Sequence, residues 1–141
     1  MFVHNINPVL IDLGFAQIRY YGLAYVIGFI VAYFMLQFLA KEKKVNLKKE
    51  DISDFLIYIA VGGLIGARLF YAFIYNPVYF LPKPMEIFFL WEGGLSFHGG
   101  LLGASIAGYI FSKKYNVSLF KLADMVVLPL VFTLVLGRIA N

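Results

Sequence analysis

This sequence has no cysteine and little charge, and both shortages limit what the chain can do. Without cysteine in its 141 residues, it has no disulfide, no thiolate metal ligand and no cysteine nucleophile. Any thiol that reacts here therefore belongs to a substrate. The two histidines, His4 and His98, lie far apart in the sequence, so no spacing predicts a transition-metal site. We expect neither a metal nor a cofactor.

Charged residues make up 14% of the chain and hydrophobic residues 62%, whereas soluble domains are roughly a quarter charged. This balance predicts an integral membrane protein. The formal net charge of +4 indicates cytoplasmic loops and contact with anionic lipid rather than with nucleic acid, because the lysines do not follow a soluble face. The first apolar segment is too long for a cleavable signal peptide, and no small-residue cleavage site follows it.

Several apolar segments have the length of a membrane span, which needs roughly 20 helical residues. Four such segments cover residues 21–40, 52–75, 95–112 and 122–141. Residues 1–20 predict an N-terminal interfacial segment, and the prolines in residues 76–91 predict a broken outer connector. We therefore expect one all-α domain over residues 1–141, a polytopic membrane helix bundle of about four transmembrane helices.

The positive residues indicate how these helices are oriented. The loops at residues 41–51 and 113–121 hold five and three lysines, whereas residues 76–94 hold only Lys83. Since positive loops stay in the cytoplasm, the N-terminus, the connector and the C-terminal end are expected to face outward. Polar residues then gather at the outer ends of their segments, namely Tyr21, Glu92, His98, Arg138 and Asn141.

Two arginines are predicted to converge at the depth of the outer headgroups. Arg68 lies seven residues in from Tyr75, roughly 10 Å below the outer end of its helix. Burying an arginine in a bilayer costs at least ~2.5 kcal/mol, so Arg68 and Arg138 need an anion or a wet cavity. A phospholipid phosphate suits a guanidinium, which donates two parallel hydrogen bonds. Pairing with Glu92 or Asp54, or snorkelling to the interface, are the alternatives.

The stretch at residues 91–103 places His98 among glycines where an apolar segment begins. A titratable residue at the mouth of a hydrophobic helix indicates a functional site, although a helix-end histidine bonded to a carbonyl is an alternative. The glycines allow close approach of backbone or of a ligand. At GxxxG spacing they most simply predict helix packing, at Gly62 with Gly66 and at Gly99 with Gly103.

Four blocks of this sequence resemble the prolipoprotein diacylglyceryl transferases of bacteria. They are YYGLAY at residues 20–25, GARLFY at 66–71, EIFFLWEGGLSFHGGLLG at 86–103 and GRIAN at 137–141. The resemblance implies an inner-membrane enzyme, active toward the outer leaflet, that moves the diacylglyceryl group of phosphatidylglycerol onto the lipobox cysteine of a prolipoprotein. The family's signature continues past the final asparagine into further helices, so we expect the N-terminal portion of a longer transferase.

The resemblance also implies roles for single residues. Tyr21 matches an essential tyrosine of the family, His98 its active-site histidine, and Arg138 and Asn141 its signature. Since a cysteine thiol has a pKa near 8.5, His98 is the expected base. Arg138 is expected to hold the phosphate, while Tyr21 and Asn141 orient headgroup oxygens.

Further lipid contacts are expected from Arg68, Gly99 and Gly100. The alternative function is a half-bundle of a small anion transporter or channel, and a packing subunit without a ligand is a third possibility. A channel predicts polar residues along the whole bilayer depth. Here they cluster at one face, which favours chemistry on a lipid headgroup.

Overall fold

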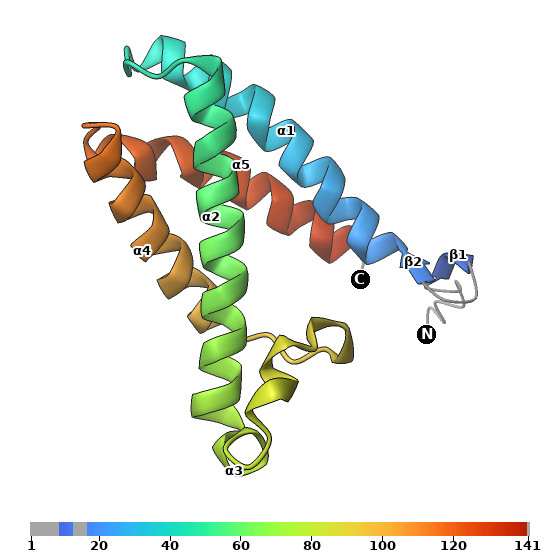
Figure 1. The fold of residues 1–141 in the computed structure, drawn as a ribbon. Helices are drawn as coiled ribbons and strands as arrows, with labels where there is room; N and C mark the ends of the chain where they lie inside the picture. The colour runs from blue at the N-terminus through green and yellow to red at the C-terminus, as the bar shows by residue number, and fades with distance from the viewer. Residues whose placement is uncertain (1–8, 13–16, 141) are drawn as a thin grey trace. The chain divides into compact units, whose positions relative to one another are not determined.

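The structure is a computed structural model that describes residues 9–12 and 17–140. Four long helices dominate this part of the chain (Figure 1), as the sequence predicts. The N-terminal segment differs, because it contains two short strands. Strand β1 (Val9–Asp12) pairs antiparallel with β2 (Gln17–Arg19), and the β-branched residues in these strands favour extended backbone. The chain divides into two compact units, residues 1–44 with 124–141, and residues 45–123.

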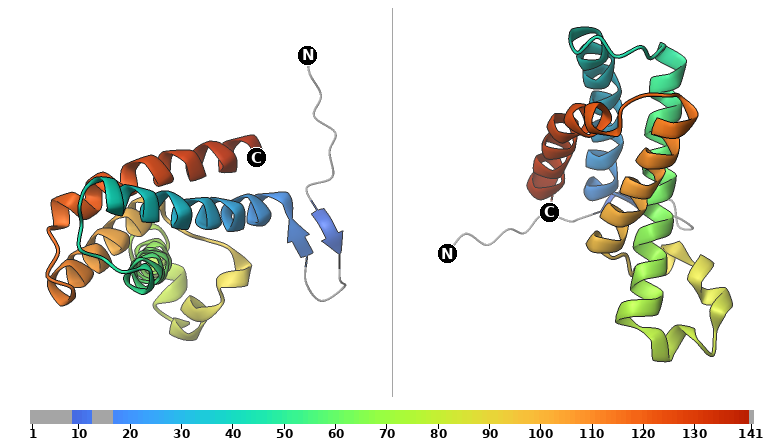
Figure 2. Two further views of the ribbon diagram at one scale, coloured as in Figure 1. Left: turned by 90° about the horizontal axis from the view of Figure 1, so that it is seen from above. Right: turned by 90° about the vertical axis from the view of Figure 1, so that its left-hand side faces the viewer.

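In the first unit, two helices lie side by side: α1 (Tyr20–Glu42) and the part of α5 (Leu119–Ala140) that follows Ala123 (Figures 1 and 2). A Cβ built on Gly28 would lie 2.6 Å from Thr133 Cγ2, so the helices touch there. Near the other end, Lys43 Nζ lies 3.5 Å from Asp124 Oδ2. These contacts define an antiparallel pair, in which the start of α1 is level with the end of α5.

The second unit is a helical hairpin with an irregular connector. Its first helix, α2 (Lys49–Phe70), begins where the Asp51 carboxylate accepts a hydrogen bond of 2.8 Å from the Lys48 N–H. It continues as a π-helical turn, η1 (Tyr71–Tyr75). The connector holds the short helices α3 (Pro77–Phe80), η2 (Pro84–Phe88) and η3 (Leu90–Glu92), before α4 (Phe97–Lys114) returns. The predicted broken connector is confirmed, with proline at the first position of two of these helices.

Helices α2 and α4 pack through glycines. A Cβ built on Gly62 would lie 2.5 Å from Ala107 Cβ, and one built on Gly66 would lie 2.7 Å from Gly103 Cα. The carbonyl oxygens of Gly66 and Gly62 likewise crowd the missing Cβ positions of Gly99 and Gly103. The predicted packing role of both GxxxG pairs is confirmed, because any side chain at these positions would force the backbones apart.

Large apolar side chains are exposed along all four long helices, among them Phe34, Ile65, Ile106 and Val131. In the described part of the chain, the segments Lys49–Tyr75 and Leu119–Ile139 are long and apolar enough to cross a membrane. A soluble monomer rarely exposes such continuous apolar surface. The structure therefore supports a membrane protein, and the expected number of four spans stays a prediction.

The glycine packing predicts different costs for two neighbouring substitutions on α2. Gly66→Ala should destabilise the helical hairpin by roughly 1–3 kcal/mol, since the new methyl overlaps the backbone of α4. Gly63→Ala is the matched control, because its Cβ would lie 3.6 Å from the Gly100 oxygen, an ordinary contact. Reversible unfolding in mixed micelles measures the difference. Equal stability of the two variants would contradict this packing.

Candidate active site

The outer end of α2 is organised by Arg68. This arginine is 4% exposed and lies in the last turn of α2, just before the π-helical turn. Its guanidinium stands 5.2 Å from the centre of the Phe80 ring, a cation–π contact from the connector. A charge buried to this extent needs polar partners on every side.

The partners of Arg68 are backbone carbonyls of the connector. Nε donates 2.8 Å to the Ile87 oxygen, and Nη2 donates to the oxygens of Glu86 at 2.8 Å and Phe89 at 2.9 Å. Nη1 donates to the oxygens of Gly93 and Gly94, the second at 3.1 Å. An arginine has five N–H donors, so all of them are used. The connector is folded around this one side chain.

The expected lipid contact of Arg68 stays a prediction, and this geometry does not favour it. A phosphate needs free N–H groups on the guanidinium, but every one of them points to a carbonyl of residues 86–94. The donors of Arg68 are satisfied by carbonyl oxygens and not by a carboxylate, which was the alternative. Arg68 therefore serves to hold the connector on α2.

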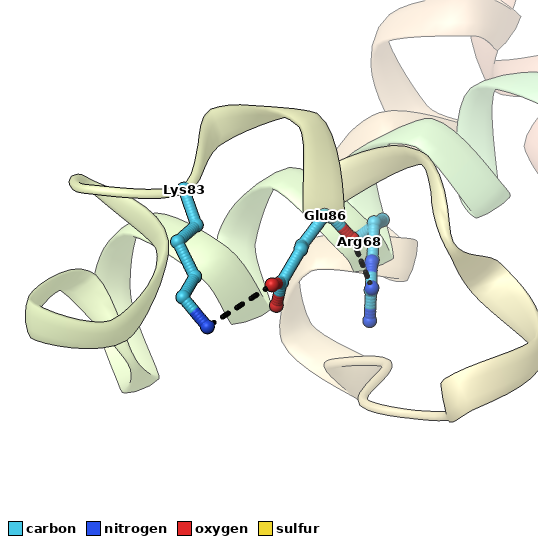
Figure 3. A network of polar contacts seen from close by, with 3 residues as sticks. All are labelled: Arg68, Lys83 and Glu86. Carbon is cyan, nitrogen blue, oxygen red and sulfur yellow. Dashed lines mark hydrogen bonds and ion pairs between the residues drawn. The ribbon is translucent and has the colours of Figure 1, made fainter.

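An ion pair links two residues of the connector close to Arg68 (Figure 3). Lys83 Nζ lies 3.3 Å from Glu86 Oε1, while the Glu86 carbonyl accepts from Arg68. A hydrogen bond from Tyr79, helped by the Lys83 ammonium, lowers the pKa of the Glu86 carboxyl from its ordinary 4.5. Beside this loop is a cavity of about 290 Å³, lined by Arg68, Tyr71, Asn76, Tyr79, Phe80, Gly93 and Gly94.

His98 lies in the first turn of α4, and its side chain is exposed. Two hydrogen bonds fix the backbone there: the Ser96 N–H donates to the Ala67 oxygen at 3.0 Å, and Ser96 Oγ accepts from the Gly99 N–H at 3.2 Å. The serine is an N-cap. The nearest ring nitrogen, Nδ1, lies 3.5 Å from Tyr75 Oη. The imidazole is thus held at the mouth of the hairpin and remains accessible.

The two glycines after His98 have different surroundings. Gly99 is buried against Phe70 and the Gly66 carbonyl, so its missing side chain serves helix packing. Gly100 is half-buried, and a Cβ there would make only ordinary contacts of 3.6 Å. The expected lipid contact stays a prediction for both glycines, and the burial of Gly99 does not favour it.

Arg138, Tyr21 and Asn141 are expected site residues outside this hairpin. Arg138 lies in the last turn of α5 with its side chain exposed. The antiparallel pairing of α1 and α5 brings the backbone of Tyr21, in the first turn of α1, to the same end of that helix pair (Figures 1 and 2). Asn141 lies outside the described residues. An open hollow of about 380 Å³ adjoins Arg138 and is otherwise lined by Val131, Leu134, Val135 and Ile139.

Two aspartates near the other ends of the helices, Asp54 and Asp124, both have partners. Asp54 accepts a hydrogen bond from the Tyr115 hydroxyl across the far end of α2 and α4, and Asp124 pairs with Lys43. Asp54 is therefore part of the helix packing. The Asp124 side chain remains 69% exposed, in keeping with a solvated flank.

Together, apolar exposed helices and a polar, glycine-rich mouth define a helical membrane protein with its candidate chemistry at a helix end. Residues 8–141 match the family described as prolipoprotein diacylglyceryl transferase. The chain belongs to this family, as its sequence blocks predict.

Relatives named phosphatidylglycerol–prolipoprotein diacylglyceryl transferase are similar over the whole chain. That of Rickettsia canadensis (strain McKiel) is 38% identical over 141 residues, which are 100% of this chain and 54% of the relative. That of Rickettsia rickettsii (strain Sheila Smith) is 39% identical over 137 residues, 97% of this chain and 53% of the relative. The chain thus spans about half the length of the curated relatives it matches.

The bonds of Arg68 predict that lysine cannot replace it. Lysine has three donors for five carbonyls, so at least two lose their partner, and Arg68→Lys should loosen the connector by roughly 2–6 kcal/mol. Hydrogen exchange of the amides in residues 86–94 measures this. Arg138→Lys, in the other unit, should leave these amides unchanged. Wild-type protection in Arg68→Lys would contradict the proposed role.

The lowered pKa of Glu86 predicts acid sensitivity of the connector. A carboxyl whose pKa falls on folding stabilises the fold above its ordinary pKa, and this contribution is lost as the pH falls through the lowered value. The thermal midpoint of the wild type should therefore fall, relative to that of Glu86→Gln, as the pH drops below 4.5. Parallel pH curves for both proteins would show that the interactions of the Glu86 carboxylate with Tyr79 and Lys83 contribute nothing to stability.

Proposed function

We propose that the protein transfers the diacylglyceryl group of phosphatidylglycerol to the lipobox cysteine of prolipoproteins. One observation carries this best: His98, in the family's characteristic block, is exposed at a rigidly capped helix start. Membership of the family and the names of the Rickettsia relatives support the same reaction. They also favour a transferase over an anion transporter or a packing subunit.

The proposed setting is the bacterial inner membrane. Helices α1, α2, α4 and α5 form four spans, and the lysine-rich loops face the cytoplasm. The N-terminus, the connector and the site then lie at the outer leaflet. Exposed aromatic residues on the connector, such as Phe88 and Trp91, suit the interface between headgroups and hydrocarbon.

The chemistry is a displacement at the glycerol carbon that carries the phosphate ester. The cysteine thiol gives its proton to His98, and the sulfur attacks this carbon. A C–S bond forms, the C–O bond breaks, and its electron pair leaves on the phosphate oxygen of glycerol phosphate. The site forms no covalent intermediate of its own, so much of the rate comes from holding lipid and thiol together.

Arg138 is the proposed phosphate ligand. Unlike Arg68, its guanidinium is exposed and makes no hydrogen bond or ion pair with the residues that the structure describes, and it borders a hollow lined by aliphatic side chains. Such a surface accommodates an acyl chain beside its phosphate, and the guanidinium stabilises the charge that grows on the leaving group. Tyr21 and Asn141 are proposed to orient headgroup oxygens, and the backbone at Gly100 to approach the lipid.

The proposed base predicts a large and specific loss. His98→Gln in the full-length protein should lower transfer by roughly 10²–10⁴-fold, the usual contribution of a general base. His4→Gln replaces the chain's other histidine and serves as the control. The assay follows thioether formation on a lipobox peptide in vesicles that contain phosphatidylglycerol. A wild-type rate in His98→Gln would disprove the assignment of the base.

A further inference from the structure

The π-helical turn at the end of α2 is an unusual feature that the fold alone does not require. Residues Tyr71–Tyr75 form it, and the Asn76 N–H closes it with a hydrogen bond of 3.1 Å to the Tyr71 oxygen, five residues back. π-Helical turns cost stability and often mark functional sites. Because the turn is wider than an α-helical one, it rotates the last side chains of the helix relative to the register of α2.

Tyr75 is the side chain that this turn delivers to the site. Its hydroxyl oxygen lies 3.5 Å from His98 Nδ1. The ring is flanked by Phe70 at 6.0 Å and Tyr71 at 6.4 Å between ring centres. Yet Tyr75 is 54% exposed, so it contributes little to a core. A packing role accounts for the ring but not for the placement of its hydroxyl.

We propose that Tyr75 is a positioning residue that fixes the tautomer and orientation of His98. The Nδ1–H of the neutral ring donates to Tyr75 Oη, which leaves the lone pair on Nε2. The hydrogen bond on one ring nitrogen decides which form the other takes. If the tyrosine donated instead, Nε2 would carry the proton and no nitrogen could accept one from a thiol. This inference rests on the proposed role of His98 as base.

The substitution Tyr75→Phe tests the inference, because it keeps the ring and removes only the hydroxyl. In the full-length protein in phosphatidylglycerol nanodiscs, kcat should fall about tenfold with KM for the lipid unchanged, as the loss of one orienting hydrogen bond predicts. The ¹⁵N spectrum of the histidines gives the second readout, with His98 assigned by the signals missing in His98→Gln. In the wild type, Nδ1 should carry the proton, and in Tyr75→Phe this preference should be lost.

Tyr58→Phe is the matched control. Tyr58 lies on the same helix, and its hydroxyl accepts a hydrogen bond of 3.1 Å from Lys114, far along the chain from His98. This variant should keep both kcat and the tautomer of His98. Wild-type kcat in Tyr75→Phe, a fall in kcat with an unchanged tautomer, or a wild-type proton on Nε2 would each overturn the inference. Loss of activity in His98→Gln would then leave the proposed function intact, whereas a fully active His98→Gln would disprove the base on which this inference rests while the transfer itself is still observed. An absence of transfer in the wild type would contradict the proposed function.

Discussion

The structure of the helical hairpin depends on one requirement, that a buried guanidinium must have all its N–H groups satisfied. Arg68 meets it with five backbone carbonyls drawn from residues 86–94. Carbonyls that point inward in this way cannot belong to a regular helix, whose oxygens lie along its axis. The broken connector is therefore the form that the backbone must take to surround this side chain, and the prolines only make it easier.

The glycine packing of the two helices serves the same end of the hairpin. Because Gly66 and Gly99 carry no side chains, α4 approaches closely enough for the Ser96 N–H to reach the Ala67 carbonyl. The acceptor of this hydrogen bond, Ala67, directly precedes Arg68 in the sequence. Helix α4 and the connector are therefore bound to α2 at adjacent residues. Through the Ser96 cap they set the direction in which α4 begins, and hence the position of His98.

Sequence reasoning found what depends on composition and period: the long helices, the interrupted connector and the packing glycines. It did not foresee the carbonyls that surround Arg68, because a charge in an apolar segment suggests an anion, whereas backbone carbonyls belong to every residue and leave no signal in the sequence. It missed Tyr75, whose register depends on a π-helical turn that no spacing predicts. The GARLFY block offered the only hint, since it ends where that turn begins. The strand pair escaped notice because each strand is shorter than a pattern can show.

The contrast between the two arginines bears on how such a site works. A residue that holds its place by binding the substrate would lose that place each time the product leaves. Arg68 instead is anchored by its own chain, so the connector and the start of α4 keep their geometry in the absence of any lipid. We propose the exposed guanidinium of Arg138 as the group that binds and releases the phosphate. Under this proposal, the preorganised connector keeps His98 in place while the phosphate ligand exchanges.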